Sequence, residues 1–182
     1  MKPPEELATP EVRLLRWRPD MAESLQEAIA DSLPELKPFM AWATDSHGLQ
    51  ESRDYIDLSG REWDAEESFQ YAIVAPDGTT IGSSSLMTRM GPGIFEIGYW
   101  VRSAYTGRGI ATATAGLLVE AGGRLDGIDL IVIKHDVANP ASGRVAEKAG
   151  FSVVREQPGD RGAPRDSGID RVWERRVGDV RR

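Results

Sequence analysis

Residues 94–124 read IFEIGYWVRSAYTGRGIATATAGLLVEAGGR and predict a strand, a glycine-containing loop and a helix in succession. In such a loop, here Thr106 to Ala111, successive backbone N–H groups turn toward one point, and the helix dipole adds partial positive charge there. The two glycines let the backbone approach an anion without an intervening Cβ atom, and Arg108 adds a charged donor. The stretch predicts a phosphate or pyrophosphate site, although a tight turn without a ligand has the same pattern.

The strands before this loop are joined by short turns, whereas those after it alternate with helices. Asp77-Gly78 and Gly91-Pro92-Gly93 supply the turns of an antiparallel meander, and Asn139-Pro140 begins a helix in the second half. We expect an α+β fold of order βααβββαβαββ, with a mixed, mostly antiparallel sheet of about seven strands flanked by helices. The expected strands lie at residues 12–17, 69–74, 80–87, 94–101, 128–134, 151–155 and 169–177. The expected helices lie at 20–32 (capped by Asp20), 50–63, 110–124 and 139–149, with a short helical segment at 36–43.

The chain has 182 residues, a length that fits one domain. We expect a core at about 12–177 within a single domain spanning 1–182, with a polar N-terminal lead and a charged C-terminal tail. No apolar stretch reaches the roughly 18–20 residues that cross a bilayer, and the N-terminus lacks a secretory signal. These features predict a soluble cytoplasmic protein with no membrane partner.

The charge and the residue types missing from the chain exclude several classes of function. A net charge of −7 argues against nucleic acid as a partner and favours a cationic one. The absence of cysteine excludes a thiolate nucleophile and Cys-ligated zinc. The two histidines, His47 and His135, have no metal-ligand spacing, so no metal is expected.

Two common phosphate-binding folds do not fit the glycine loop. A P-loop requires Gly-Lys-Ser/Thr at its end, which is missing here. A dinucleotide-binding fold places its loop after a buried parallel strand, usually the first of the domain. Here the preceding strand carries Glu96 and follows an antiparallel meander, so the topology excludes that fold.

Three motifs occur in order and carry a resemblance that runs from about Val12 to Val177. They are Glu96-Ile97-Gly98-Tyr99-Trp100-Val101, Gly107-Arg108-Gly109-Ile110-Ala111-Thr112, and Asn139-Pro140-Ala141-Ser142 through Ala146-Glu147-Lys148-Ala149-Gly150-Phe151. With these motifs the chain resembles the GNAT superfamily of N-acetyltransferases. Within it, the chain is similar to the RimJ/RimL-like branch, which acetylates N-terminal serine or alanine of ribosomal proteins.

The resemblance implies a GNAT fold and acetyl-CoA as cosubstrate. It also implies that the strand before the loop separates from the next parallel strand, so that pantetheine lies between them. Trp100 and Val101 would then supply backbone partners to pantetheine, and Asn139 would contact it besides capping its helix. The pyrophosphate would be bound by Thr106, Gly107, Arg108, Gly109, Ile110 and Ala111. One departure is Thr106, because the family has Arg or Gln there, so the site loses one long side chain.

The chemistry of acetyl transfer requires a neutral amine. Deprotonating a lysine of pKa ~10.4 at pH 7 costs about 4–5 kcal/mol, but an α-amine of pKa ~7.7–8.0 costs only about 1–1.4 kcal/mol. A weak or water-relayed base therefore suffices for an N-terminal amine. The resemblance implies Glu96 as this base, although strand alternation could instead point it to solvent or to an arginine. It also implies that Ser142 hydrogen-bonds the coenzyme sulfur, although a serine there could simply cap the helix.

The sequence thus predicts an acetyl-CoA-dependent N-acetyltransferase that transfers acetyl directly to a primary amine, preferably a protein N-terminal α-amine. Two alternatives remain open. One is an acetyltransferase for a small, antibiotic-like amine. The other is a non-catalytic acyl-CoA sensor on the same fold, which Thr106 makes plausible. A monomer or a homodimer is expected.

Overall fold

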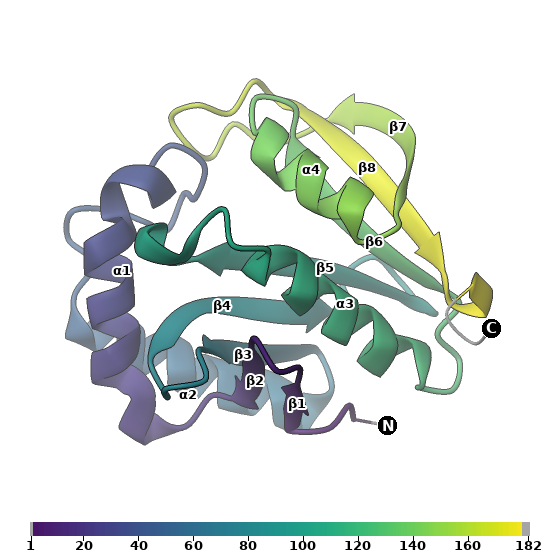
Figure 1. Ribbon diagram of the computed structural model, residues 1–182. Coiled ribbons are helices and arrows are strands. Elements are labelled where there is room, and N and C mark those ends of the chain that lie inside the picture. The colour runs from purple at the N-terminus through teal and green to yellow at the C-terminus, as the bar shows by residue number, and fades with distance from the viewer. Residues whose placement is uncertain (1, 180–182) are drawn as a thin grey trace.

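The computed structural model describes residues 2–179, and Figure 1 shows them as one twisted sheet with helices packed against it. The strand order is β1-β2-β3-β4-β5-β6-β8-β7. Neighbouring strands are antiparallel, except that β5 and β6 run parallel. This confirms the expected mixed, mostly antiparallel sheet. The strands are β1 (Glu6–Ala8), β2 (Arg13–Arg16), β3 (Ser68–Val74), β4 (Thr80–Met87), β5 (Ile94–Val101), β6 (Leu130–Asp136), β7 (Ser152–Pro158) and β8 (Ile169–Arg176). Met1 and residues 180–182, the end of the expected charged tail, lie outside the described residues.

Four α-helices cover the two faces of this sheet. Helices α1 and α2 pack on the face that carries Trp100, in a core with Trp17, Leu25 and Ile56. Helices α3 and α4 pack on the opposite face, where alternate residues of β5 and β6 form the larger core. Figure 1 shows α3 and α4 on the near side of the sheet and α2 behind it. The helices are α1 (Ala22–Leu36), α2 (Leu49–Ala65), α3 (Ile110–Gly123) and α4 (Pro140–Lys148), with 3₁₀ turns η1 (Pro19–Met21), η2 (Ser103–Tyr105) and η3 (Val177–Asp179).

Strand β1 is an eighth strand that the sequence did not reveal. It has three residues, too few for an alternating pattern, and it lies in the lead expected to be merely polar. It pairs antiparallel with β2, with Glu6 opposite Leu15. The hydroxyl of buried Tyr71 donates to the Pro4 carbonyl at 2.9 Å and helps to fix the chain just before it. The expected order is therefore confirmed from β2 onward, with one strand added in front.

The region of α1 differs from expectation at both ends. Asp20 was expected to cap the helix, but it lies in η1, and α1 begins at Ala22 with no side-chain cap. The Asp20 carboxylate instead accepts a hydrogen bond from Arg18 at 3.1 Å. The helix also continues through Pro34 to Leu36, a buried residue that gains core contacts there. Residues 37–43, expected to be helical, form turns instead.

The parallel pair β5–β6 stops before either strand ends. Its last paired residues are Ile97 and Ile133, although β5 continues to Val101 and β6 to Asp136. Residues 98–101 of β5 therefore have only β4 as a paired neighbour. We call this separation the split. Its geometry is the one that the resemblance implied for the strands on either side of pantetheine.

Close approach of the backbones of β4 and β5 at Gly82 fixes one side of the split. A Cβ atom on Gly82 would lie 2.2 Å from the Trp100 carbonyl oxygen. We expect Gly82→Ala to lower the free energy of unfolding by about 1–3 kcal/mol, because the strands must move apart. Gly116→Ala is the control, since that exposed α3 position has no atom within 4 Å and alanine favours a helix. Urea unfolding measures both, and equal stability of the two variants would contradict the packing argument.

Candidate active site

The glycine loop lies where η2 passes into α3. Gly107 and Gly109 have φ of 73° and 78°, in the left-handed region that glycine adopts without strain. Gly109 is the N-cap of α3. Among the described residues, the backbone N–H groups of 107–111 have no hydrogen-bond partner. The loop therefore presents free donors at a helix N-terminus, the arrangement that binds phosphate groups.

The two polar side chains of the loop have different environments. The Thr106 hydroxyl donates to the Ser103 carbonyl at 2.9 Å, so it turns back into η2. It therefore does not replace the long side chain that the family has there. The Arg108 guanidinium lies 5.1 Å from the centre of the Tyr105 ring, a cation–π distance that keeps it beside the loop.

Helix α1 anchors the junction between β5 and the glycine loop. The Ser103 N–H donates to the buried Ser32 hydroxyl at 3.0 Å, and the Ser103 hydroxyl donates to Glu35 at 2.8 Å. Arg102 forms an ion pair with Asp31. These contacts join segments about 70 positions apart, so no local sequence pattern predicts them. They fix the direction in which β5 leaves the sheet.

Trp100 and Val101, the expected backbone partners of pantetheine, lie in the part of β5 that pairs with β4 but not with β6. Their side chains point to opposite faces: Trp100 packs in the α1/α2 core and Val101 against the α3/α4 core. The ring centre of exposed Trp42 is 6.0 Å from that of Trp100. The backbone of β5 at the split therefore has packed side chains on both faces of the sheet.

Ser142 lies across the split from β5, in the first turn of α4. Asn139 caps that helix, because its side-chain oxygen accepts the Ser142 N–H at 3.4 Å. The Ser142 hydroxyl oxygen lies 2.8 Å from the Tyr99 hydroxyl oxygen, and the Ser142 carbonyl oxygen lies 3.3 Å from it, so the single Tyr99 proton has two acceptors within reach. Burial raises the pKa of Tyr99, and the hydrogen bond with Ser142 partly offsets this. Tyr99 belongs to the motif at residues 96–101, but the sequence alone does not identify it as a site residue.

Glu96 is buried on the other face of β5, the α1/α2 face. Its side chain is 3% exposed, yet Arg89 donates to both carboxylate oxygens: Nε to Oε2 at 2.8 Å and Nη2 to Oε1 at 2.5 Å. The hydrogen bond to Glu96 raises the pKa of Arg89. Strand alternation therefore points Glu96 to an arginine, the second possibility left open by the sequence. Glu96 lies on the α1/α2 face, one residue before the pairing with β6 ends, and Ser142 lies at the split on the α3/α4 face.

Two loops meet on the side of the molecule near Trp42. The Arg165 N–H, in the loop between β7 and β8, donates to the Pro38 carbonyl at 2.9 Å in the turns after α1. The Asp136 carboxylate, at the end of β6, accepts hydrogen bonds from the Ser167 N–H and hydroxyl and from the Gly168 N–H at 2.8–3.1 Å. Asp136 therefore fixes the β7–β8 loop to the strand that forms one side of the split.

His135 and His47 both form hydrogen bonds with neighbouring residues. The buried His135 accepts a hydrogen bond from Trp173 at Nε2 (2.9 Å), and its Nδ1 lies 2.8 Å from the Asp136 carbonyl. His47 contacts Gln26. Between residues 2 and 179, no group of three or more potential ligands could hold a metal ion. Within the same residues, no helix is long and apolar enough to cross a membrane.

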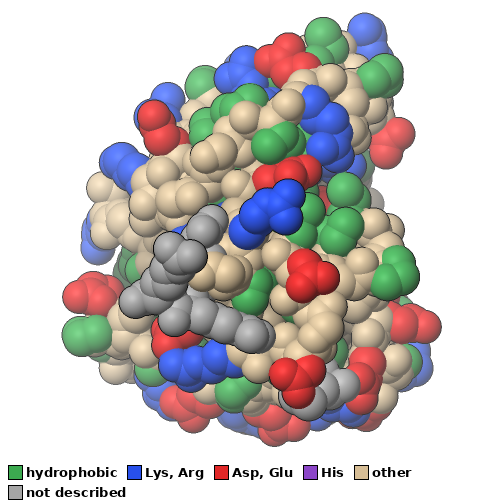
Figure 2. All heavy atoms as spheres, turned by 90° about the vertical axis from the view of Figure 1, so that its right-hand side faces the viewer, with side chains coloured by type: hydrophobic (Ala, Val, Ile, Leu, Met, Phe, Trp, Pro, Cys, Tyr) green, Lys and Arg blue, Asp and Glu red, His purple; other side chains and the backbone are tan. Residues whose placement is uncertain are grey.

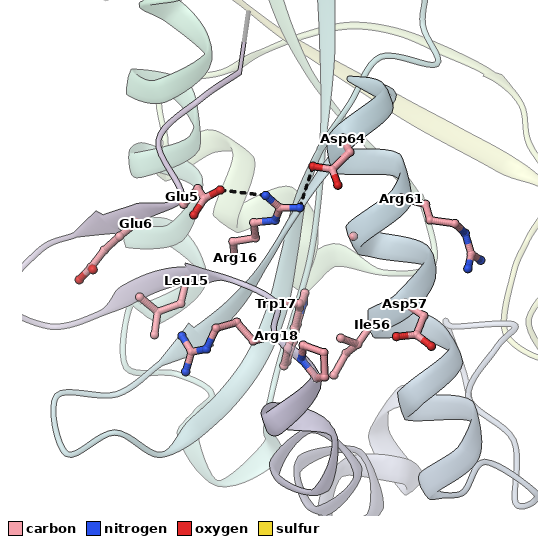
Figure 3. A pocket seen from close by; sticks show the side chains of 12 residues that line it. Glu5, Glu6, Leu15, Arg16, Trp17, Arg18, Ile56, Asp57, Arg61 and Asp64 are labelled. Carbon is pink, nitrogen blue, oxygen red and sulfur yellow. Dashed lines mark hydrogen bonds and ion pairs between the residues drawn. The ribbon is translucent and has the colours of Figure 1, made fainter.

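Among the described residues, one hollow on the surface is lined by none of the predicted site residues. A hollow of about 600 Å³ lies between the N-terminal lead, β2 and α2, where Arg16 bridges Glu5 and Asp64 (Figure 3). Figure 2 shows the end of the molecule that carries the C-terminus, where acidic and basic side chains are interspersed. The candidate site is therefore the split together with the glycine loop.

A model of the acetyltransferase (GNAT) domain family matches residues 11–152, so the chain belongs to this family. It is therefore an acetyltransferase, and acetyl-CoA is its acetyl donor. The free loop amides and the split fit this donor. Family membership confirms the resemblance and counts against the non-catalytic sensor, the second of the two alternatives. No curated protein sequence matches the chain.

Solved structures share the fold at low sequence identity. One is RimJ of Mycobacterium smegmatis with CoA-disulfide (TM-score 0.88, 18% identity, covering 100% of this chain and 93% of that one). Another is the microcin C7 self-immunity acetyltransferase MccE with acetyl-CoA and AMP (0.84, 23%, covering 91% and 92%). A third, from Salmonella typhimurium, modifies the N-terminal serine of ribosomal protein L7/L12 (0.82, 19%, covering 94% and 99%). These likenesses establish the fold.

The loop geometry predicts that coenzyme binding depends on the left-handed backbone at Gly107. We expect Gly107→Ala to weaken binding of CoA about tenfold, because an alanine at this φ costs about 1–3 kcal/mol and the loop relaxes away from its donor geometry. Gly78→Ala is the matched control, with φ of 91° and likewise no atom within 4 Å of the added Cβ. Isothermal titration with CoA measures both, and equal dissociation constants would refute the loop assignment.

Asp136 gives the stability a defined pH dependence. Burial alone would raise the pKa of Asp136, but hydrogen bonds from Ala138, Ser167 and Gly168 lower it to about 2. A carboxyl group whose pKa falls on folding stabilises the protein above its unfolded pKa of about 4 and loses that contribution as pH falls through the folded value. The stability advantage of wild type over Asp136→Asn should therefore be constant above about pH 5 and shrink between about pH 4 and 2. Chemical unfolding at several pH values checks this, and a constant difference down to pH 2 would contradict it.

Proposed function

We propose that this acetyltransferase transfers acetyl from acetyl-CoA directly to the α-amine of a protein N-terminus. The observation that carries the proposal is that a buried carboxylate next to the split and a hydroxyl at the split lie on opposite faces of the sheet. Glu96 lies on the face where the α1–α2 turns and the β7–β8 loop meet, and Ser142 lies on the face of α3 and α4. An amine approaching from the first face leaves the second face for the departing sulfur.

Binding of the donor rests on the backbone of this chain. The N–H groups of 107–111 would bind the pyrophosphate, with Arg108 beside them, and the first turn of α3 adds its dipole. Trp100 and Val101 would offer backbone groups to pantetheine, and Asn139 holds the start of α4 on the other side. Backbone N–H donors do not depend on the side chain at position 106. Binding of the pyrophosphate would therefore tolerate Thr106 in place of the family's Arg or Gln.

Glu96 would act on the acceptor amine. Each of its oxygens already accepts from Arg89, so a remaining lone pair is available to an ammonium group or a bridging water. Such a carboxylate is a weak base. An α-amine near pKa ~8 needs only about 1–1.4 kcal/mol for deprotonation at pH 7, whereas lysine needs about 4–5 kcal/mol. This difference favours an N-terminal amine as acceptor.

The reaction would proceed without an acetyl-enzyme intermediate on cysteine, since the chain has none. The amine nitrogen forms the new C–N bond, the C–S bond breaks with its electron pair on sulfur, and the amine proton passes to Glu96 or water. A backbone N–H near Val101 would stabilise the oxyanion, and Ser142 would donate a hydrogen bond to the departing sulfur. The Salmonella typhimurium structure is described as an acetyltransferase that modifies the N-terminal serine of ribosomal protein L7/L12, which supports this acceptor class.

An acceptor comparison tests the proposal. Thiol release from acetyl-CoA is measured with peptides beginning with Ser, Ala or Thr, with the same peptides carrying a blocked N-terminus and an internal lysine, and with a panel of small amines. We expect turnover with free N-termini alone. Glu96→Gln should lower kcat by about 10²-fold with CoA affinity unchanged.

Turnover with small amines but not with peptides would contradict the proposed acceptor. It would favour the alternative, a small, antibiotic-like amine, in line with the likeness to MccE. Full activity of Glu96→Gln across pH 6–9 would remove Glu96 as base while leaving the acceptor class intact. The peptide series and the variant thus test separate parts of the proposal.

A further inference from the structure

The hydrogen bond between Tyr99 and Ser142 crosses the split. Tyr99 lies two residues beyond Ile97, where pairing with β6 ends, and Ser142 lies in α4, the helix that follows β6. The two hydroxyl oxygens are 2.8 Å apart. No other polar side chain is hydrogen-bonded to the Ser142 hydroxyl among the described residues. Tyr99 is therefore the group that sets the orientation of the Ser142 hydroxyl.

Either hydroxyl could donate in this hydrogen bond, and the surroundings favour Tyr99 as the donor. Burial raises the pKa of Tyr99, so its hydroxyl is protonated at neutral pH and can donate. The Ser142 oxygen lies nearer to it than the Ser142 carbonyl, 2.8 Å against 3.3 Å. When Tyr99 donates to this oxygen, the Ser142 proton is free to point elsewhere. The Ser142 N–H is directed to Asn139, so the hydroxyl remains as the donor for a ligand in the split.

We propose that Tyr99 is a positioning residue, which donates to the Ser142 hydroxyl and thereby directs the Ser142 proton toward the sulfur of coenzyme A. A hydroxyl that accepts one hydrogen bond becomes a stronger donor in the next. The pair would then stabilise negative charge on the sulfur as the C–S bond breaks. This inference rests on the proposed function, in which Ser142 donates to that sulfur, and no proton needs to leave Tyr99.

The first test needs no acceptor, so it is independent of the acceptor class. CoA bound to the protein is titrated between pH 5 and 10 and its thiolate is followed by ultraviolet absorbance, after subtraction of the ligand-free titration. We expect the thiol pKa of bound CoA to be lower in wild type than in Tyr99→Phe or Ser142→Ala. Tyr71→Phe is the matched control, because it removes another buried tyrosine hydroxyl, one bonded to the Pro4 carbonyl.

The double variant separates positioning from simple packing. If Tyr99 acts through Ser142, Tyr99→Phe should produce no further change in the thiol pKa when Ser142 is already alanine. The same thiol pKa in wild type and Tyr99→Phe, or equal shifts in both backgrounds, would overturn the inference.

Turnover provides the second readout, with whichever acceptor wild type uses. Tyr99→Phe should lower kcat about tenfold with KM for acetyl-CoA changed less than twofold, and it should have little effect in the Ser142→Ala background. A raised KM with unchanged kcat would show that Tyr99 only shapes the binding site, which contradicts the proposal. If other acceptors are acetylated but peptides are not, the proposed acceptor class is wrong. The role of Tyr99 is then still decided by the thiol titration, which needs no acceptor.

Discussion

The site depends on the point at which β5 and β6 stop pairing. On one side, β5 is held against β4, where Gly82 leaves no room for a side chain beside the Trp100 carbonyl. On the other side, β6 remains paired with β8 to its last residue, Asp136. Each strand therefore follows its outer neighbour, and the inner edges separate. Because both strands are parallel, their carboxyl ends and the N-termini of α3 and α4 lie at the same edge of the sheet, the usual place for a ligand in such folds.

The same separation divides the chemistry between two faces. Successive residues of a strand point to opposite sides, so Glu96 and Trp100 face α1 and α2, whereas Tyr99 faces α3 and α4. Arg89 offsets the burial of the Glu96 charge, which would otherwise be costly. Tyr99 and Ser142 bridge the split on the other face. An acyl group bound at the split would therefore have a carboxylate, that of Glu96, on one face and the hydroxyls of Tyr99 and Ser142 on the other.

Selection of the acceptor is expected from the segments that contact each other near Trp42. The turns after α1 and the β7–β8 loop have little regular structure, and they are joined by the Arg165–Pro38 hydrogen bond and fixed by Asp136. Solved structures that share this fold have different described roles: MccE is a microcin C7 self-immunity acetyltransferase, and the Salmonella typhimurium protein modifies the N-terminal serine of L7/L12. Conserving the split while varying these loops would allow one fold to serve several amines.

The sequence predicted the element order from β2 onward, the glycine loop and the cap at Asn139, because these features depend on local periodicity, turn chemistry and capping. It also determined that transfer cannot pass through a cysteine. Strand β1, the start of α1 and the contacts of α1 with Ser103 were decided by the tertiary structure, since they depend on partners distant in the chain. The same holds for Glu96 and Tyr99: the sequence placed both on one strand, but only the packed fold put Arg89 against the first and Ser142 against the second. Side-chain partners across a sheet are set by how strands and helices pack, and no local pattern contains that information.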